Sequence, residues 1–438
     1  MSHWKRNLAV LASAQFLTMV GFSLYMSFIP YYMQEISGIS DAEAMRWAAY
    51  FQTGGAISMM IAAPIWGTLA DRYGRKMMLV RATAAGSIMA FLMGLAQSPG
   101  QILVLRVIQG GFSGTAAAAM TLAATTTPEA SLGRALGLMQ MISFVSHAVG
   151  PFIGGILADA LSYRAVFPIA SGMMVVSLIS VVLAVRENRE AIAGRKPRER
   201  VRTGRFRFTS VVGMDSLLLI GALAGTSLAA STLSPVLAMY IKSLAPTSDR
   251  LATLAGALTS VSSVTASLAA LGIGYFGDRF GQKRALVACC LGVAAVAIPQ
   301  AFVTTALQLA ILRGIHGMFV GGIMPTANAL LTQSTAPERR GSVLGLSSGA
   351  QSGGRAVGPS LGAAVAASWG MGSTFLLNGG VFLLLSGLIA WFVRVAPHQA
   401  ATPAPEAGPS APLAEPSRPA AGRSGWPVPS SPPSRQDR

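Results

Sequence analysis

The 438-residue chain is apolar and basic: 52% of its residues are hydrophobic and 11% are charged, with 33 Lys and Arg against 16 Asp and Glu. Soluble globular domains carry roughly a quarter of their residues as charged side chains, so the composition excludes an ordinary soluble protein. Apolar stretches of about twenty residues recur almost end to end, which is long enough to cross a bilayer as helices. The runs are continuous rather than alternating, which excludes a transmembrane barrel. We therefore expect an all-α membrane protein.

Twelve apolar segments are predicted to be transmembrane helices, arranged as two pseudo-symmetric bundles of six. The N-terminal bundle takes residues 1–185 and the C-terminal bundle residues 210–395. A basic cytoplasmic linker, 186–209, joins them, and a tail rich in Pro, Ala and Ser, 396–438, is expected to be disordered in the cytoplasm. The predicted helices cover approximately 7–33, 46–70, 77–97, 100–124, 133–158, 164–185, 210–241, 251–276, 285–303, 306–331, 342–367 and 373–394.

The formal charge of +17 is distributed unevenly between the loops. If the N-terminus is cytoplasmic, the inner loops and the linker hold most Lys and Arg, whereas the outer loops hold only Arg46, Arg164, Lys242 and Arg250. This asymmetry satisfies the positive-inside rule with both termini in the cytoplasm. The basic charge is therefore topological. We expect a multi-pass protein of the bacterial inner membrane with no nucleic-acid partner.

Three motifs recur at one offset and identify an internal repeat. Gly67-Thr-Leu-Ala-Asp71-Arg72-Tyr-Gly74-Arg75-Lys returns 207 residues later as Gly-Tyr-Phe-Gly-Asp278-Arg279-Phe-Gly-Gln-Lys. The segment around Arg106 returns at Arg313, and Gly150-Pro151-Phe-Ile-Gly154-Gly155 returns as Gly358-Pro359-Ser-Leu-Gly362-Ala. Six helices per copy give both halves the same orientation. Such parallel repeats place the substrate site near mid-membrane between the halves.

These motifs resemble those of the major facilitator superfamily, in the twelve-helix drug:proton antiporter branch that includes tetracycline and multidrug exporters. The Gly67–Lys76 loop is similar to the signature between helices 2 and 3, and the Arg106 segment to the helix 4 signature. The segment Ser146-x-x-x-Gly150-Pro151-x-x-Gly154-Gly155 resembles the helix 5 antiporter signature, except that Ser stands where the family has Gly. The resemblance covers roughly residues 5–395.

The resemblance implies that the Asp71 loop latches the two halves together in one conformation. Gly67 is expected to allow close helix packing and Gly74 a tight turn, while Arg72 and Arg75 anchor the loop inside. Asp278 and Arg279 repeat the pattern in the second half. The simpler interpretation is a topological loop without a moving part.

Several charged residues fall inside predicted helices, where a charge is costly and normally faces a cavity or a partner. Arg106 either tunes a protonatable group or contacts substrate, as the family signature implies, or it bonds to backbone carbonyls; Arg313 has the same alternatives. His147 and Arg355, four residues before Pro151 and Pro359, form a positive cavity face for anionic or polar neutral substrates, or they bond to neighbouring helices. The only acid inside a predicted span is Asp215. His147, Asp215 or Glu35 could carry a proton.

The family fold places the cavity between helices 1, 4, 7 and 10. The candidate lining residues are Gln15, Phe22, Tyr25, Gln109, Phe112, Met318, Phe319 and Asn328. The small residues around Pro151 and Pro359 favour tight helix packing and are also expected to seal one end of the path.

We expect a secondary active transporter that exports small hydrophobic or anionic molecules and drugs in exchange for protons, by alternating access. It would use the proton gradient rather than a cofactor, bind no metal, contact a small-molecule substrate and the lipid bilayer, and act as a monomer. The same fold could instead take up a metabolite or an organic anion, and a non-transporting membrane sensor is a further alternative. The chain shows no enzyme signature of the HExxH or nucleophile type and no nucleotide-binding loop.

Overall fold

The computed structural model describes residues 3–185, 214–335 and 340–393. Within these ranges the side chains of some helical residues, Asp71, Arg72, Asp215 and Asp278 among them, are outside the description. The linker predicted at 186–209 and the tail predicted at 396–438 also lie outside the described residues. Both halves belong to one compact unit, residues 1–395.

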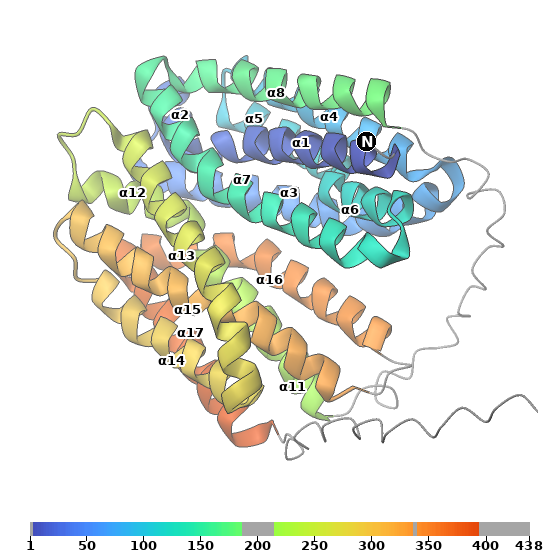
Figure 1. Cartoon of the computed structure of the whole chain (residues 1–438). Helices are drawn as coiled ribbons and strands as arrows, with labels where there is room; N and C mark the ends of the chain where they lie inside the picture. The colour runs from blue at the N-terminus through green and yellow to red at the C-terminus, as the bar shows by residue number, and fades with distance from the viewer. Residues whose placement is uncertain (1–2, 186–213, 336–339, 394–438) are drawn as a thin grey trace, which may run out of the picture. The chain divides into compact units, whose positions relative to one another are not determined.

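The described chain is helical throughout, apart from short connections (Figure 1). The N-terminal half contains α1 (His3–Leu24), α2 (Ile29–Ser37), α3 (Asp41–Tyr73), α4 (Arg75–Gly94), α5 (Pro99–Gly111), α6 (Thr115–Thr126), α7 (Leu132–Ala160) and α8 (Tyr163–Ala184). The C-terminal half contains α11 (Met214–Thr232), α12 (Ser234–Leu244), α13 (Leu251–Phe280), α14 (Gln282–Gln300), α15 (Ala306–Gln333), α16 (Arg340–Trp369) and α17 (Met371–Phe392).

Eleven of the described segments are long and apolar enough to cross a membrane. The twelfth predicted span, 342–367, forms α16, a helix of 30 residues whose many Ser and Gly residues lower its hydropathy. The structure thus supplies the twelve long helical segments of the predicted fold.

Three predicted helices are each divided into two, which corrects the sequence-based spans 7–33, 100–124 and 210–241. Pro30 and Pro235 stand in the first turns of α2 and α12, and proline disrupts a helix that continues through it but is tolerated at a helix start. The third break lies between α5 and α6, where Gly114 has φ of 116°, a conformation that suits glycine. The continuous apolar runs concealed these breaks because hydropathy reports burial in the membrane and not backbone continuity.

The hydrophobic core is shared between the halves at one end of the bundle and divided at the other. We call these the Asp41 end, where α3 begins, and the Gly74 end, where α3 gives way to α4. The largest cluster joins residues of both halves near the Asp41 end, from Val20 and Phe51 to Leu237 and Phe375. Toward the Gly74 end each half has a cluster of its own, which contains Leu122 in one half and Leu330 in the other.

Candidate functional site

Arg106 is the centre of a polar network inside the N-terminal half. Its Nη1 donates a hydrogen bond of 2.7 Å to Gln109 Oε1, and its guanidinium lies 4.7 Å from the ring centre of Phe22 and 4.9 Å from that of Phe51. Gln109 Nε2 donates to the carbonyl of Gly86, and the amide also contacts the Tyr25 hydroxyl. Four of the predicted site residues are therefore brought together, from α1, the turn that follows it and α5.

Close backbone contact between α3 and α5 makes room for this network. A Cβ on Gly55 would lie 2.6 Å from Arg106 Nε, so only glycine leaves space for the guanidinium. Gly110 in turn packs directly on the backbone of Gly55. Stacking on aromatic faces and paired hydrogen bonds are interactions that a planar guanidinium makes and an ammonium does not. Arg106 and Gly55 thus fit together: the guanidinium makes one hydrogen bond and lies near two aromatic rings in space that a side chain at position 55 would fill.

Tyr25 is placed differently from the prediction. It is 0% exposed and stacks on Phe167 of α8, with ring centres 5.1 Å apart. It therefore belongs to the core of the N-terminal half rather than to the lining of an open cavity. Phe319 is partly buried, and its ring packs against Gly292 of α14 within the C-terminal half.

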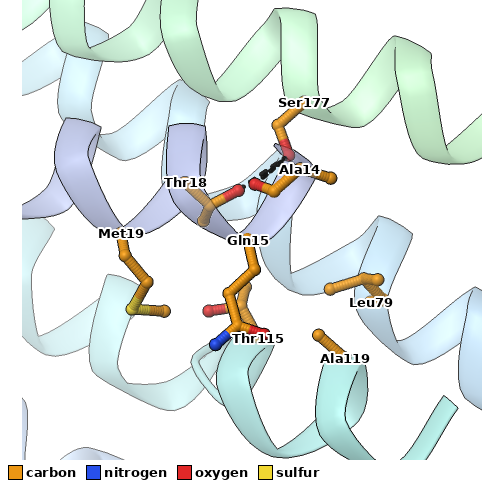
Figure 2. Close-up of a pocket in the computed structure, with 8 residues that line it drawn as sticks. All are labelled: Ala14, Gln15, Thr18, Met19, Leu79, Thr115, Ala119 and Ser177. Atoms are coloured by element: carbon orange, nitrogen blue, oxygen red, sulfur yellow. Dashed lines mark hydrogen bonds between the residues drawn. The ribbon is translucent and has the colours of Figure 1, made fainter. Parts of the chain in front are cut away.

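Gln15 lines a small cavity in the N-terminal half together with Ala14, Thr18, Met19, Leu79, Thr115, Ala119 and Ser177 (Figure 2). Its Nε2 donates to the carbonyl of Met139 and to Ser143 Oγ, whereas its buried Oε1 has no hydrogen-bond partner among the described residues. The hydroxyls of Thr18 and Ser177, two residues that line the cavity, form a hydrogen bond of 2.8 Å with each other. The cavity lies within one half, so it is separate from the predicted path between the halves.

A second cation that sequence reasoning missed stands at the break between α5 and α6. The Arg81 guanidinium lies 3.3 Å from the ring centre of Trp66 and donates to the carbonyls of Phe112 and Ser113. Trp66 Nε1 donates to the carbonyl of Gly111. Arg81 and Trp66 thus satisfy backbone acceptors that the helix break leaves free. The signal was present, because Arg81 is a charge inside the predicted span 77–97.

The remaining predicted side chains are spread over the end of α5 and over α7, α15 and α16. Phe112 is 39% exposed and Met318 52% exposed, and Asn328 is partly buried. His147 and Arg355 are exposed, and each bonds within its own helix: His147 Nδ1 to the carbonyl of Ser143, and Arg355 to Ser352 Oγ.

The two halves are joined by polar contacts at the Asp41 end. Lys242 of α12 forms an ion pair of 2.7 Å with Asp41, and the Tyr31 hydroxyl donates to the carbonyl of Ala238. Asp159, at the end of α7, accepts from the backbone N–H groups of Ala252 and Thr253 in the first turn of α13. An anion at a helix N-terminus satisfies free N–H groups and is favoured by the helix dipole.

The predicted packing glycines lie toward the Asp41 end of the bundle. A Cβ on Gly150 or Gly154 would collide with Ser23 or Leu24 of α1, and one on Gly358 or Gly362 with Ser231 or Thr232 of α11. Pro151 lies opposite Gly256 of α13. Gly155 contacts the other half directly, because its Cβ would meet the carbonyl of Ala252.

Glycines nearer the Gly74 end have open space around them. A Cβ on Gly133 or Gly137 of α7 would meet no atom of a neighbouring described element within 4 Å, and the same holds for Gly345, Gly349 and Gly353 of α16. The halves are therefore locked at the Asp41 end, while these two helix faces are uncovered at the other end.

The predicted latch can be described only in part, because the side chains of Asp71, Arg72 and Asp278 lie outside the description. Gly74 has φ of 91° and Gly281 has φ of 95°, so glycine suits both helix junctions. Gly67 faces open space, which differs from the expected close packing. Arg279 lies over the ring of Phe280, and Arg75 also has an interaction partner.

Comparison with known proteins assigns this fold to a family. The family model described as Major Facilitator Superfamily matches residues 11–248 and 219–433. This chain belongs to that superfamily, so it is a multi-pass membrane transporter. It is 34% identical over 400 residues to "Multidrug resistance protein MdtG" of Rahnella sp., covering 91% of this chain and 96% of the relative. An Escherichia coli protein of the same name is 32% identical over 393 residues, covering 89% and 94%.

Solved structures with the same fold are more distant in sequence. The crystal structure of the nucleoside transporter NupG matches with a TM-score of 0.70 at 14% identity, covering 89% of this chain and 98% of that chain. A bacterial homologue of the human lysosomal transporter Spinster, in an inward-facing and unoccupied conformation, matches with a TM-score of 0.67 at 16% identity, covering 91% and 99%. At this level of identity the likeness concerns the fold alone.

Proposed function

We propose that this chain exports small hydrophobic or anionic molecules from a bacterial cell in exchange for protons, by alternating access. The observation that carries the proposal is the uneven joining of the halves: one shared core at the Asp41 end and two separate cores at the Gly74 end. Parallel repeats that bind substrate between them work by rocking about that site. The contacts at one end and the uncovered glycine faces at the other support such a motion.

Charge distribution supports the orientation of this motion. The positive-inside rule places the Gly74 end, with Arg75, Lys76 and Lys283, in the cytoplasm. With this orientation, the joined Asp41 end would face the outside and the Gly74 end the cytoplasm, the side from which an exporter takes its substrate.

The relatives and the charges inside the spans support the substrate class. MdtG proteins at 32–34% identity are named for multidrug resistance. In the span interiors of this chain the cations Arg106, Arg313 and Arg355 stand without a described carboxylate nearby, since described acids such as Asp41 and Asp159 lie at the helix ends. A positive interior favours anionic and neutral compounds over organic cations.

The test is accumulation of norfloxacin, deoxycholate and ethidium in an efflux-deficient bacterium that expresses the wild type, with and without a protonophore. We expect wild-type cells to hold less norfloxacin and deoxycholate than cells with an empty plasmid, and the protonophore to abolish the difference. Asp71→Asn is expected to abolish it too. Unchanged accumulation of all three compounds, with the protein confirmed in the membrane, would overturn export. Uptake of an organic anion would then be the function to measure.

A further inference from the structure

His316 of α15 is a titratable side chain buried near the middle of a membrane span. It lies ten residues from the start of the helix at Ala306, about 15 Å along the helix axis. The residue is 5% exposed, and neither ring nitrogen has a hydrogen-bond partner among the described residues. Buried polar groups are nearly always hydrogen-bonded, so an imidazole without partners in this position requires an explanation.

The groups next to the ring are also incompletely paired. Asn378 of α17 lies within side-chain hydrogen-bonding reach of His316, and Arg313, one turn earlier on α15, places a positive charge near the ring. Asn378 Nδ2 donates to the carbonyl of Ala229 on α11, but Asn378 Oδ1 has no described donor. Arg313 Nε likewise has no described acceptor. A neutral imidazole has one N–H and one lone pair, whereas an imidazolium has two N–H groups. An added proton would give both ring nitrogens an N–H, so a donor would be available to Asn378 Oδ1 whichever tautomer the neutral ring adopts.

The same two positions in the N-terminal half hydrogen-bond to each other, although Arg106 Nε, like Arg313 Nε, has no described acceptor. Arg313 and His316 lie 207 residues after Arg106 and Gln109. Gln109 accepts from Arg106 at 2.7 Å and donates to the carbonyl of Gly86. The C-terminal half has histidine where the N-terminal half has glutamine, and a histidine side chain can bind and release a proton whereas a glutamine side chain cannot.

The helices packed around His316 present few other titratable groups. The span interiors of α11, α13 and α17 carry none between 216–232, 251–274 and 371–392, respectively. The buried thiols Cys289 and Cys290 lie on α14, and Arg355 lies on α16. The acids of this half are Asp249, which is exposed in a loop, and Asp215, Asp278 and Glu338, whose side chains lie outside the description.

From the unpartnered ring and the unpartnered Asn378 Oδ1 beside it, we propose that His316 carries the proton that is exchanged for substrate, and that Asn378 positions the ring. This inference rests on the proposed proton-coupled export. In one state the free ring nitrogen takes a proton from hydronium and leaves water; in the other state the N–H bond breaks and the proton returns to water. One proton crosses in each cycle. While the proton is bound, both ring nitrogens carry an N–H, so the nitrogen nearer to Asn378 Oδ1 is then always a donor.

The test separates proton movement from substrate movement in inside-out membrane vesicles. Vesicles are acidified by respiration, and proton release on adding norfloxacin, deoxycholate or ethidium is followed with a pH-sensitive dye. Exchange of labelled compound across vesicles without a gradient is measured in parallel. His316→Gln, which installs the residue found at position 109, is expected to lose proton release and to keep exchange. His398→Gln, in the segment after Val395, is the matched control and is expected to keep both.

The outcomes distinguish this inference from the function on which it rests. If the wild type releases protons and His316→Gln still does so, His316 is not the carrier although the transporter is proton-coupled. If the wild type releases no protons with any of the three compounds, the proposed coupling itself is wrong. If His316→Gln also loses exchange, His316→Asn is measured instead; retained exchange without proton release supports the proposal, and loss of both activities in this variant too contradicts it.

Discussion

Asp159 of the N-terminal half accepts a hydrogen bond of 2.7 Å from the backbone N–H of Thr253 in the C-terminal half. Its other carboxylate oxygen accepts from Ala252 N–H at 3.2 Å. The carboxylate thus satisfies two of the N–H groups that open the first turn of α13, across the boundary between the halves. Four residues earlier on the same helix, Gly155 packs on the carbonyl of Ala252. One turn of α7 therefore provides both the polar and the steric part of the closure.

Removing the Asp159 carboxylate should open the Asp41 end more often. Hydrogen bonds to a charged group contribute about 1.5–3 kcal/mol each when well shielded. Because Asp159 is only partly buried, we expect a total loss of about 2 kcal/mol, or a shift of roughly 30-fold toward the open state. Spin labels at exposed positions 37 and 247 in a cysteine-free background should move apart in Asp159→Ala. Asp249→Ala, an exposed acid in the loop before α13, should leave the distance unchanged; equal distances in both variants would contradict the role of Asp159.

A single methyl group at Gly155 should block the same closure. Its Cβ would collide with the backbone of Ala252, which cannot rotate away as a side chain can. Overpacking of this kind costs about 1–3 kcal/mol. Gly155→Ala is therefore expected to reduce export in the cellular accumulation assay at normal protein abundance. Gly137→Ala, on the same helix but facing open space, should retain export, and equal loss in both variants would show that the α7–α13 contact is not the cause.

Arg106→Lys should reduce transport although it retains the charge. Lysine lacks the planar guanidinium that lies between Phe22 and Phe51 and that bonds to Gln109. Loss of one charge-assisted hydrogen bond costs about 1.5–3 kcal/mol, or at least a tenfold change in an equilibrium constant. The measurement is the accumulation of the compound that the wild type exports most strongly, with Arg46→Lys as the exposed control. Full export by Arg106→Lys would mean that a positive charge alone suffices at this position.

Trp66→Leu should lower thermal stability more than it changes substrate preference. The variant removes the ring under Arg81 and the hydrogen bond to the carbonyl of Gly111. A desolvated cation–π contact contributes about 2 kcal/mol, and a neutral hydrogen bond about 1 kcal/mol. Buried Cys289 and Cys290 report unfolding when a thiol-reactive dye gains access to them. We expect a lower unfolding temperature for Trp66→Leu than for Trp391→Leu, whose ring is exposed. Equal unfolding temperatures would show that the contact between Arg81 and Trp66 does not stabilise the α5–α6 break.

The fold could be predicted from the sequence because hydropathy and repetition act over whole helices. Twenty apolar residues leave the backbone in lipid no alternative but a helix or a barrel, and the repeat of the Asp71 and Arg106 motifs determines the number of bundles. Helix breaks are local events. Those before Pro30 and Pro235 could have been found from proline, whereas the break at Gly114 depends on one residue in a run of small ones.

The site was harder to predict, because the direction of a side chain depends on helix rotation. Met318 is exposed while its neighbour Phe319 packs inward, although both residue types suit a drug cavity. Adjacent positions on a helix differ by about 100°, so an error of one residue reverses the assignment. His316 was also passed over, since nothing in the sequence near it indicates that its ring lacks a partner. That information comes from Asn378 and Ala229, on two other helices.

Transport by purified protein in liposomes, with the pH gradient imposed in either direction, tests the central claim most directly. Export in exchange for protons predicts that an acidic lumen drives uphill uptake of the exported compound, that a protonophore abolishes this uptake, and that equal pH on both sides gives only equilibration. Uptake driven by an alkaline lumen, or uptake at the same rate in all three conditions, would contradict proton antiport by this chain.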